Sequence, residues 1–150
     1  MLKSILDFFQ QSLAPEGAKA ESTERRLQLA TAALMLEMSK VDGVVSEPEL
    51  LAMRQALAEQ FDLAEDAIGR LLDLADAEAR DSAGDYAFTS LINKGYSPEE
   101  KVRVFEYMWR IAYADGHVDA HENHFMRKLA DLLYISRADY AEAKRRAREG

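Results

Sequence analysis

A short acidic motif occurs twice in this chain, 73 residues apart, and it holds most of the side chains that could do chemistry. The first copy reads Asp-Gly-Val-Val-Ser-Glu-Pro-Glu over residues 42–49, and the second reads Asp-Gly-His-Val-Asp-Ala-His-Glu over residues 115–122. Both copies concentrate carboxylate or hydroxyl oxygens, which are the ligands that hard divalent cations prefer. The motif therefore predicts a site for Ca²⁺, Mg²⁺ or Mn²⁺ at each copy.

The expected geometry of each copy brings two acids together across a turn. The first Asp ends a predicted helix, where the helix dipole opposes a negative charge by roughly 0.3–1 kcal/mol, so a bound cation would offset the repulsion. The last Glu comes early in the next helix and can fold back over the turn. The second copy is the stronger candidate, because Asp119 supplies a carboxylate where the first copy has Ser46. The predicted ligands are Asp42, Ser46, Glu49, Asp115, Asp119 and Glu122.

The same residues would also make a well-capped turn without any ion. The glycine of each copy can end a helix in a left-handed conformation. Ser46 and Asp119 are good N-caps, and the Glu three residues after each of them completes a capping box. This interpretation stays open beside the first.

Other metal sites are less favoured by the pattern. A calcium EF-hand would need acids at positions occupied by Ile111 and Tyr113 in the second copy, so the motif is not an EF-hand. His117, His121 and His124 could hold zinc, but the first copy has no histidine at the equivalent positions. Exposed histidines at a helix start are the favoured interpretation, with zinc as the alternative.

Composition bounds the class of protein. Of the 150 residues, 48% are hydrophobic and 31% charged, as in soluble globular proteins, and the absence of Cys excludes disulfides and thiol chemistry. The net charge of −8 argues against a nucleic-acid partner. No apolar run approaches the roughly 20 residues of a membrane-spanning helix, and no signal-peptide pattern begins the chain, so a cytoplasmic location is expected. No nucleophile–base pair, P-loop or dinucleotide-binding turn is present, which predicts a protein without enzymatic activity.

Apolar residues recur at helical spacing along most of the chain and never alternate with period two, which predicts an all-α fold without a sheet. Ser97, Pro98 and Glu100 together mark one helix start, and Gly95 in the C′ position closes the helix before it. We expect a single compact domain of about seven helices over residues 24–150. The expected helices cover residues 24–41, 47–60, 65–80, 86–94, 98–114, 120–133 and 137–148.

The two ends of the chain carry features of their own. Residues 1–13 are predicted to form a short amphipathic helix, and residues 14–23 a linker. The apolar stripe of the helix is Leu2, Ile5, Leu6, Phe9 and Leu13. We expect this segment to pack back on the domain or to be disordered, with peripheral membrane contact as the alternative. The basic residues 144–148 suit a helix C-terminus, and anionic lipid is again the alternative.

The repeat extends beyond the acidic motif. Met35 corresponds to Met108 before the motif, and Met53 corresponds to Met126 after it. We therefore expect two helical halves, related by an approximate twofold axis and packed through their apolar central helices.

The pattern of a long helix, Ala/Val-Asp-Gly-x-Val-x-x-x-Glu and an amphipathic helix, used twice, resembles the TerB-like family of tellurite-resistance proteins. The resemblance covers residues 24–148 and is most specific over residues 40–49 and 97–122. A related domain stands at the N-terminus of the membrane-anchored co-chaperone DjlA, but this chain has no J-domain. The resemblance implies a compact all-α fold, a link to stress-response machinery near the inner membrane, and no established catalytic activity. It also implies metal-binding acids, which here are Asp42, Glu49, Asp115 and Glu122.

Two functions follow from these observations. In the first, the protein is a non-enzymatic module that binds a divalent cation at its acidic corners, docks an unidentified protein partner and is linked to stress or tellurite resistance. In the second, it is a helical scaffold for protein–protein interaction, co-chaperone-like and near the membrane, in which the corners serve only as caps.

Overall fold

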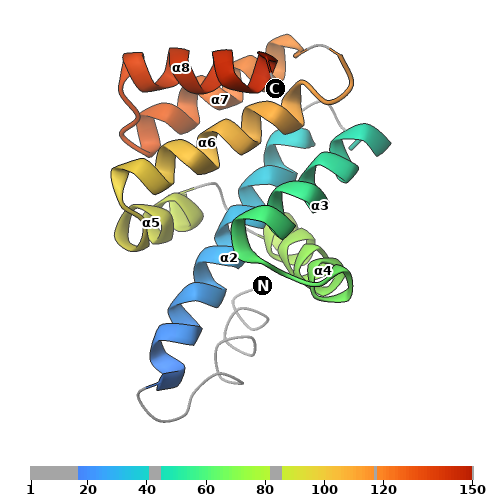
Figure 1. Ribbon diagram of the computed structural model, residues 1–150, viewed down its shortest axis with the longest axis vertical. Coiled ribbons are helices and arrows are strands. Elements are labelled where there is room, and N and C mark those ends of the chain that lie inside the picture. Colours follow the sequence, from blue (N-terminus) through green and yellow to red (C-terminus); the bar gives the residue numbers. More distant parts are fainter. Residues whose placement is uncertain (1–16, 41–44, 82–85, 117, 150) are drawn as a thin grey trace.

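The computed structural model describes residues 17–40, 45–81, 86–116 and 118–149, and within them the chain forms seven helices and no strand (Figure 1). The all-α prediction is therefore confirmed. The helices are α2 (Gly17–Ser39), α3 (Glu47–Phe61), α4 (Glu65–Asp81), α5 (Tyr86–Gly95), α6 (Pro98–Ala112), α7 (Ala120–Leu132) and α8 (Arg137–Glu149). None of them combines the length and apolar character needed to cross a bilayer.

The predicted boundaries differ most at the N-terminal side. Helix α2 begins at Gly17 rather than at residue 24, so residues 17–23 of the expected linker are helical. Residues 1–16, which include the predicted N-terminal helix, lie outside the described residues. Helix α6 ends at Ala112, two residues before the expected end. The twofold relation between the halves stays a prediction.

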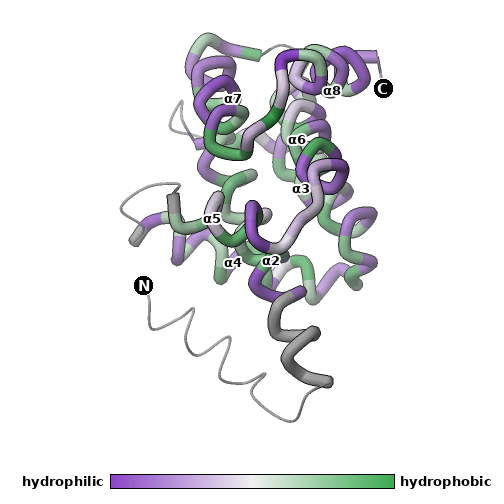
Figure 2. The backbone as a smooth tube through the Cα atoms, turned by 90° about the vertical axis from the view of Figure 1, so that its left-hand side faces the viewer, coloured by the Kyte–Doolittle hydropathy of each residue, from purple (hydrophilic) through white to green (hydrophobic). Residues whose placement is uncertain are grey.

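Helix α2 is the central element of the fold. It contacts α3, α4, α5, α6 and α7, and every residue from Leu29 to Leu36 is buried. The one hydroxyl in that run, Thr31, donates to the carbonyl of Leu27 at 2.7 Å, which satisfies it inside the helix. In Figure 2, hydrophobic and hydrophilic segments alternate along α6 and α7, as expected of helices with one buried face.

Gly95 has a packing role that the sequence did not reveal. It is the last residue of α5 and not the residue after the helix, so the predicted C′ position is wrong. A Cβ at this position would lie 2.6 Å from Leu27 Cδ2. Glycine is therefore suited to this position because it lets α5 and α2 approach closely.

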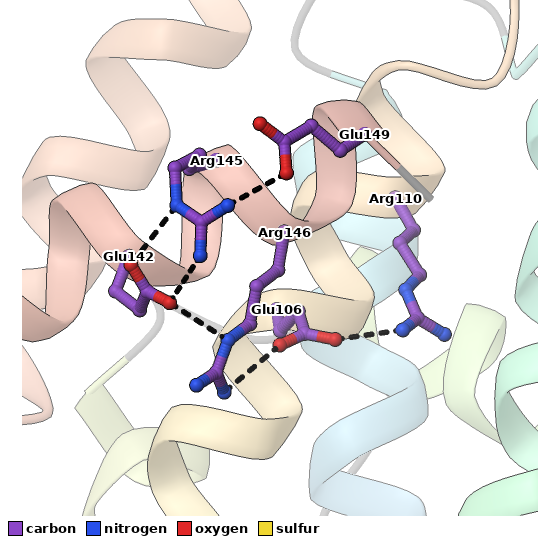
Figure 3. Close-up of polar contacts among 6 residues, drawn as sticks. All are labelled: Glu106, Arg110, Glu142, Arg145, Arg146 and Glu149. Atoms are coloured by element: carbon purple, nitrogen blue, oxygen red, sulfur yellow. Dashed lines mark hydrogen bonds and ion pairs between the residues drawn. The ribbon is translucent and has the colours of Figure 1, made fainter.

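Helices α6 and α8 pack against each other through a cluster of aromatic rings, and charged side chains pair between them closer to the surface. Phe105 lies 5.4 Å from Tyr140 and 6.1 Å from Trp109, measured between ring centroids. On the surface, Glu106 pairs with Arg110 of its own helix at 2.7 Å and with Arg146 of α8 at 3.9 Å (Figure 3). The aromatic contacts supply most of the stabilisation, because exposed ion pairs contribute little.

Candidate carboxylate site between the two corners

The two corners, residues 42–49 and 115–122, lead into α3 and α7 through complete capping boxes. Ser46 has an extended backbone, and its Oγ accepts a hydrogen bond from the Glu49 amide at 3.2 Å while its own N–H donates to Glu49 Oε1 at 3.3 Å. Asp119 Oδ1 accepts from the Glu122 amide at 2.8 Å, and the Asp119 N–H donates to Glu122 Oε1 at 3.3 Å. Both predicted caps are confirmed.

A third capping box shows that capping does not by itself bury the glutamate. Ser97 and Glu100 at the start of α6 make the same two hydrogen bonds, at 2.8 and 3.2 Å, yet Glu100 is only half-buried. Glu49 and Glu122, by contrast, are 2% and 3% exposed. The burial of these two acids therefore has a cause other than capping.

The buried glutamates of the two corners interact directly. Burial raises the pKa of Glu122 most strongly, and a hydrogen bond with Glu49 and the negative charges of Glu49 and Asp119 raise it further, to about 8, although the Asp119 N–H opposes the shift. A carboxyl that hydrogen-bonds another carboxyl does so through a proton held between them. At neutral pH the pair therefore holds one proton.

Each of the two carboxyls has one oxygen outside its capping box. Apart from the proton between the pair, no N–H or O–H group of the described residues reaches the buried Oε2 atom of Glu49 or of Glu122. A buried acceptor without a donor is costly, and two facing carboxylates add repulsion to that cost. Such a pair can be neutralised either by a proton or by a cation.

The other predicted ligands have different surroundings. Ser46 also donates its hydroxyl to Glu49 Oε1 at 3.0 Å, so it and Asp119 are engaged as caps. Asp115 is exposed in the turn after α6, not in the last helical turn as expected, and Asp42 lies outside the described residues. In the part of the chain that the structure describes, no three His, Cys, Asp or Glu side chains converge as metal ligands would.

The remaining corner residues fit the sequence analysis. Gly116 has φ +102°, the left-handed conformation predicted for it, whereas Gly43 lies outside the described residues. His121 and His124 are exposed, and His117 also lies outside the described residues.

The contact between Glu49 and Glu122 was not predicted from the sequence, because each corner was expected to close on itself. The spacing contained a signal for it, since the two glutamates occupy equivalent positions of the repeat. Only positions near a twofold axis meet their own equivalents, so the predicted twofold relation between the halves would place these two glutamates near its axis. The two predicted sites are therefore better described as one pair of acids.

Comparison with known protein families found a family that matches most of the chain. Residues 28–145 match the family described as Tellurite resistance protein TerB, a range that includes both corners and both buried glutamates. The chain belongs to the TerB family. No curated protein and no solved structure matches it.

Within this TerB-family domain, the two central helices bring the acids together. Both α3 and α7 contact α2, and both contact α6, and the interaction of Glu49 with Glu122 brings the N-terminal turns of α3 and α7 together. The positive ends of the two helix dipoles also point toward the pair, which favours negative charge there. This arrangement suits the binding of a proton or a small cation, with the acids as ligands.

Proposed function

We propose that this TerB-family protein is a non-catalytic binding module in which one divalent cation, Ca²⁺, Mg²⁺ or Mn²⁺, bridges Glu49 and Glu122. The observation that carries the proposal is the burial of two carboxyls against each other, each with an oxygen that no other donor of the described residues reaches. A cation would replace the shared proton and remove the repulsion between the carboxylates. Zinc is the weaker candidate because histidine or thiolate ligands are absent from the pair.

In this arrangement the two corners share one ion and do not form two independent sites. Glu49 and Glu122 supply the first ligands, and the flanking acids Asp42, Asp115 and Asp119 add negative charge or further oxygens. Water and backbone carbonyls complete the shell, so we expect weaker binding than at a dedicated calcium loop. By its family name we connect the module to tellurite resistance, with cation binding adjusting a surface that docks a protein partner.

An amide NMR titration tests the site directly. Chelator-stripped protein is titrated with Ca²⁺, Mg²⁺ and Mn²⁺, and we expect saturable changes at residues 45–49 and 118–122 together, with one affinity. Glu49→Gln or Glu122→Gln should abolish both sets of changes, whereas Glu100→Gln is the matched control in a capping box of the same type and should leave them intact. Two independent affinities, or binding that survives the double variant Glu49→Gln/Glu122→Gln, would contradict a bridging cation.

One observation favours a metal-independent scaffold as the second candidate. The raised pKa of Glu122, about 8, gives the pair a shared proton that neutralises it without any metal. In that case the pair is a structural contact between the corners, and the module acts only through its helical surface. A spectrum unchanged at millimolar cation, together with a retained carboxyl proton at neutral pH, would support the scaffold.

A further inference from the structure

Helix α4 carries more apolar surface than the core covers. Ile68, Leu72 and Ala75 are buried in the core. A second stripe follows beside them at helical spacing, made of Ala67 and Leu74, both half-buried, with Leu71 on the boundary between the two stripes. An apolar arc this wide is typical of a helix that packs against a neighbour on both sides.

A groove of about 450 Å³ lies along this second stripe, between α4 and α2. Its apolar lining is Leu63, Ala67, Leu71 and Leu74, and Arg25, Gln28 and Arg70 also line it. The apolar lining suits a row of aliphatic or aromatic side chains presented by another helix.

We propose that the N-terminal segment, residues 2–13, docks in this groove through its apolar stripe, antiparallel to α2. The stripe places Leu2, Ile5, Leu6, Phe9 and Leu13 on one face of a helix. An isolated helix of this length is marginal in water, so the segment gains a stable structure only by burying that face.

The length of the connection places the segment at the groove. As a helix, residues 2–13 would be about 18 Å long at 1.5 Å per residue. Helix α2 begins at Gly17, and Arg25 and Gln28, which line the groove, lie about 12 and 16 Å further along it. A segment that reverses direction over residues 14–16 therefore brings its first apolar residues alongside the groove.

The sequence of the connection favours such a reversal. Pro15 disfavours a helical conformation at Ala14, so a helix over residues 2–13 would end before it. Antiparallel helix pairs are joined by loops of two to five residues, which matches residues 14–16. The short connection also makes docking on the same chain more favourable than docking on another molecule, because it raises the effective concentration.

The lack of cysteine allows a clean test in the full chain. A nitroxide is attached to Ser4→Cys, which lies opposite the stripe on a helix, and the intensity of every amide signal is compared with that of the reduced label. Docking predicts a selective loss of intensity at residues 63–74 that persists on dilution. Leu74→Arg in the groove and Ile5→Arg in the segment should each restore those signals, whereas Leu51→Arg, at a side chain that is 58% exposed on α3, should not.

Several outcomes would overturn the proposal. Intensity loss that appears when nitroxide-labelled and isotope-labelled chains are mixed would assign the groove to a second copy. Loss at α3 around Leu51, or no localised loss without lipid vesicles, would assign the segment to another surface or to a membrane. Unchanged signals of α5 to α7 in Leu74→Arg establish that the variant is folded, so that a restored signal reports on docking.

Discussion

Protonation of Glu122 is coupled to folding. In the folded protein, burial and the neighbouring Glu49 raise the pKa of Glu122 from 4.5 to about 8, so the folded chain holds this proton more tightly than the unfolded chain. The stabilisation is complete below about pH 4.5 and is lost as the pH rises through about 8. The free energy of unfolding should therefore fall across this window, with a contribution of at most about 1.4 kcal/mol per pH unit.

Urea denaturation at several pH values, with a chelator present, measures the contribution of Glu122 protonation to the free energy of unfolding. Glu122→Gln should remove it, because glutamine mimics the protonated acid and can still donate a hydrogen bond to Glu49. Glu100→Gln should keep the slope of the original protein, since Glu100 has no carboxyl partner of this kind in its capping box. An unchanged slope in Glu122→Gln would show that the pair is ionised or separated in solution.

Replacing either of two glycines with alanine should change the stability of the protein in opposite directions. Gly69 is inside α4 with nothing within 4 Å of an added Cβ, so Gly69→Ala should stabilise the protein by about 0.5–1 kcal/mol. At Gly95 the added methyl displaces Leu27, and overpacking of this kind costs about 1–3 kcal/mol. Thermal unfolding should rank Gly95→Ala below Gly69→Ala. Equal stabilities would show that Leu27 moves aside freely.

The pairing of α6 with α8 should depend on its aromatic contacts more than on its charges. Phe105 is fully buried against Trp109 and Tyr140, and Phe105→Ala should cost about 3–5 kcal/mol. Arg146 is 58% exposed, and Arg146→Ala should cost less than about 1 kcal/mol. Chemical denaturation measures both. A larger loss for Arg146→Ala would mean that the ionic network, and not the ring cluster, holds α8.

The protein as a whole should be stabilised by the proposed cation in proportion to its occupancy. At a free cation concentration 100 times the dissociation constant, binding adds about 2.7 kcal/mol to the free energy of unfolding. Because the chain carries a net charge of −8, any cation also screens repulsion, so ionic strength must be held constant. The matched control is the exposed Glu47→Gln, which removes one negative charge, as Glu49→Gln/Glu122→Gln does from a pair that shares one proton. Only the buried pair should abolish the stabilisation.

The sequence predicted local structure well because helix starts and apolar periodicity are local signals. Ser97, Pro98 and Glu100 define the start of α6 within four residues, and the structure follows them. Contacts between distant segments were not predicted in the same way. Gly95 against Leu27 and Glu49 against Glu122 depend on how helices pack, which neither residue's neighbours in the chain specify.

The long separation of Glu49 and Glu122 along the chain has a consequence for how a bridging ion would behave. An unfolded chain must close a loop of 73 residues to bring the two acids together, and the entropy of that closure leaves it with no preformed site. Nearly all of the binding free energy would then be folding free energy. In a chain without cysteine, the ion would act as a reversible cross-link, removed by a chelator and restored by the ion itself, and the folded fraction would follow the free cation concentration.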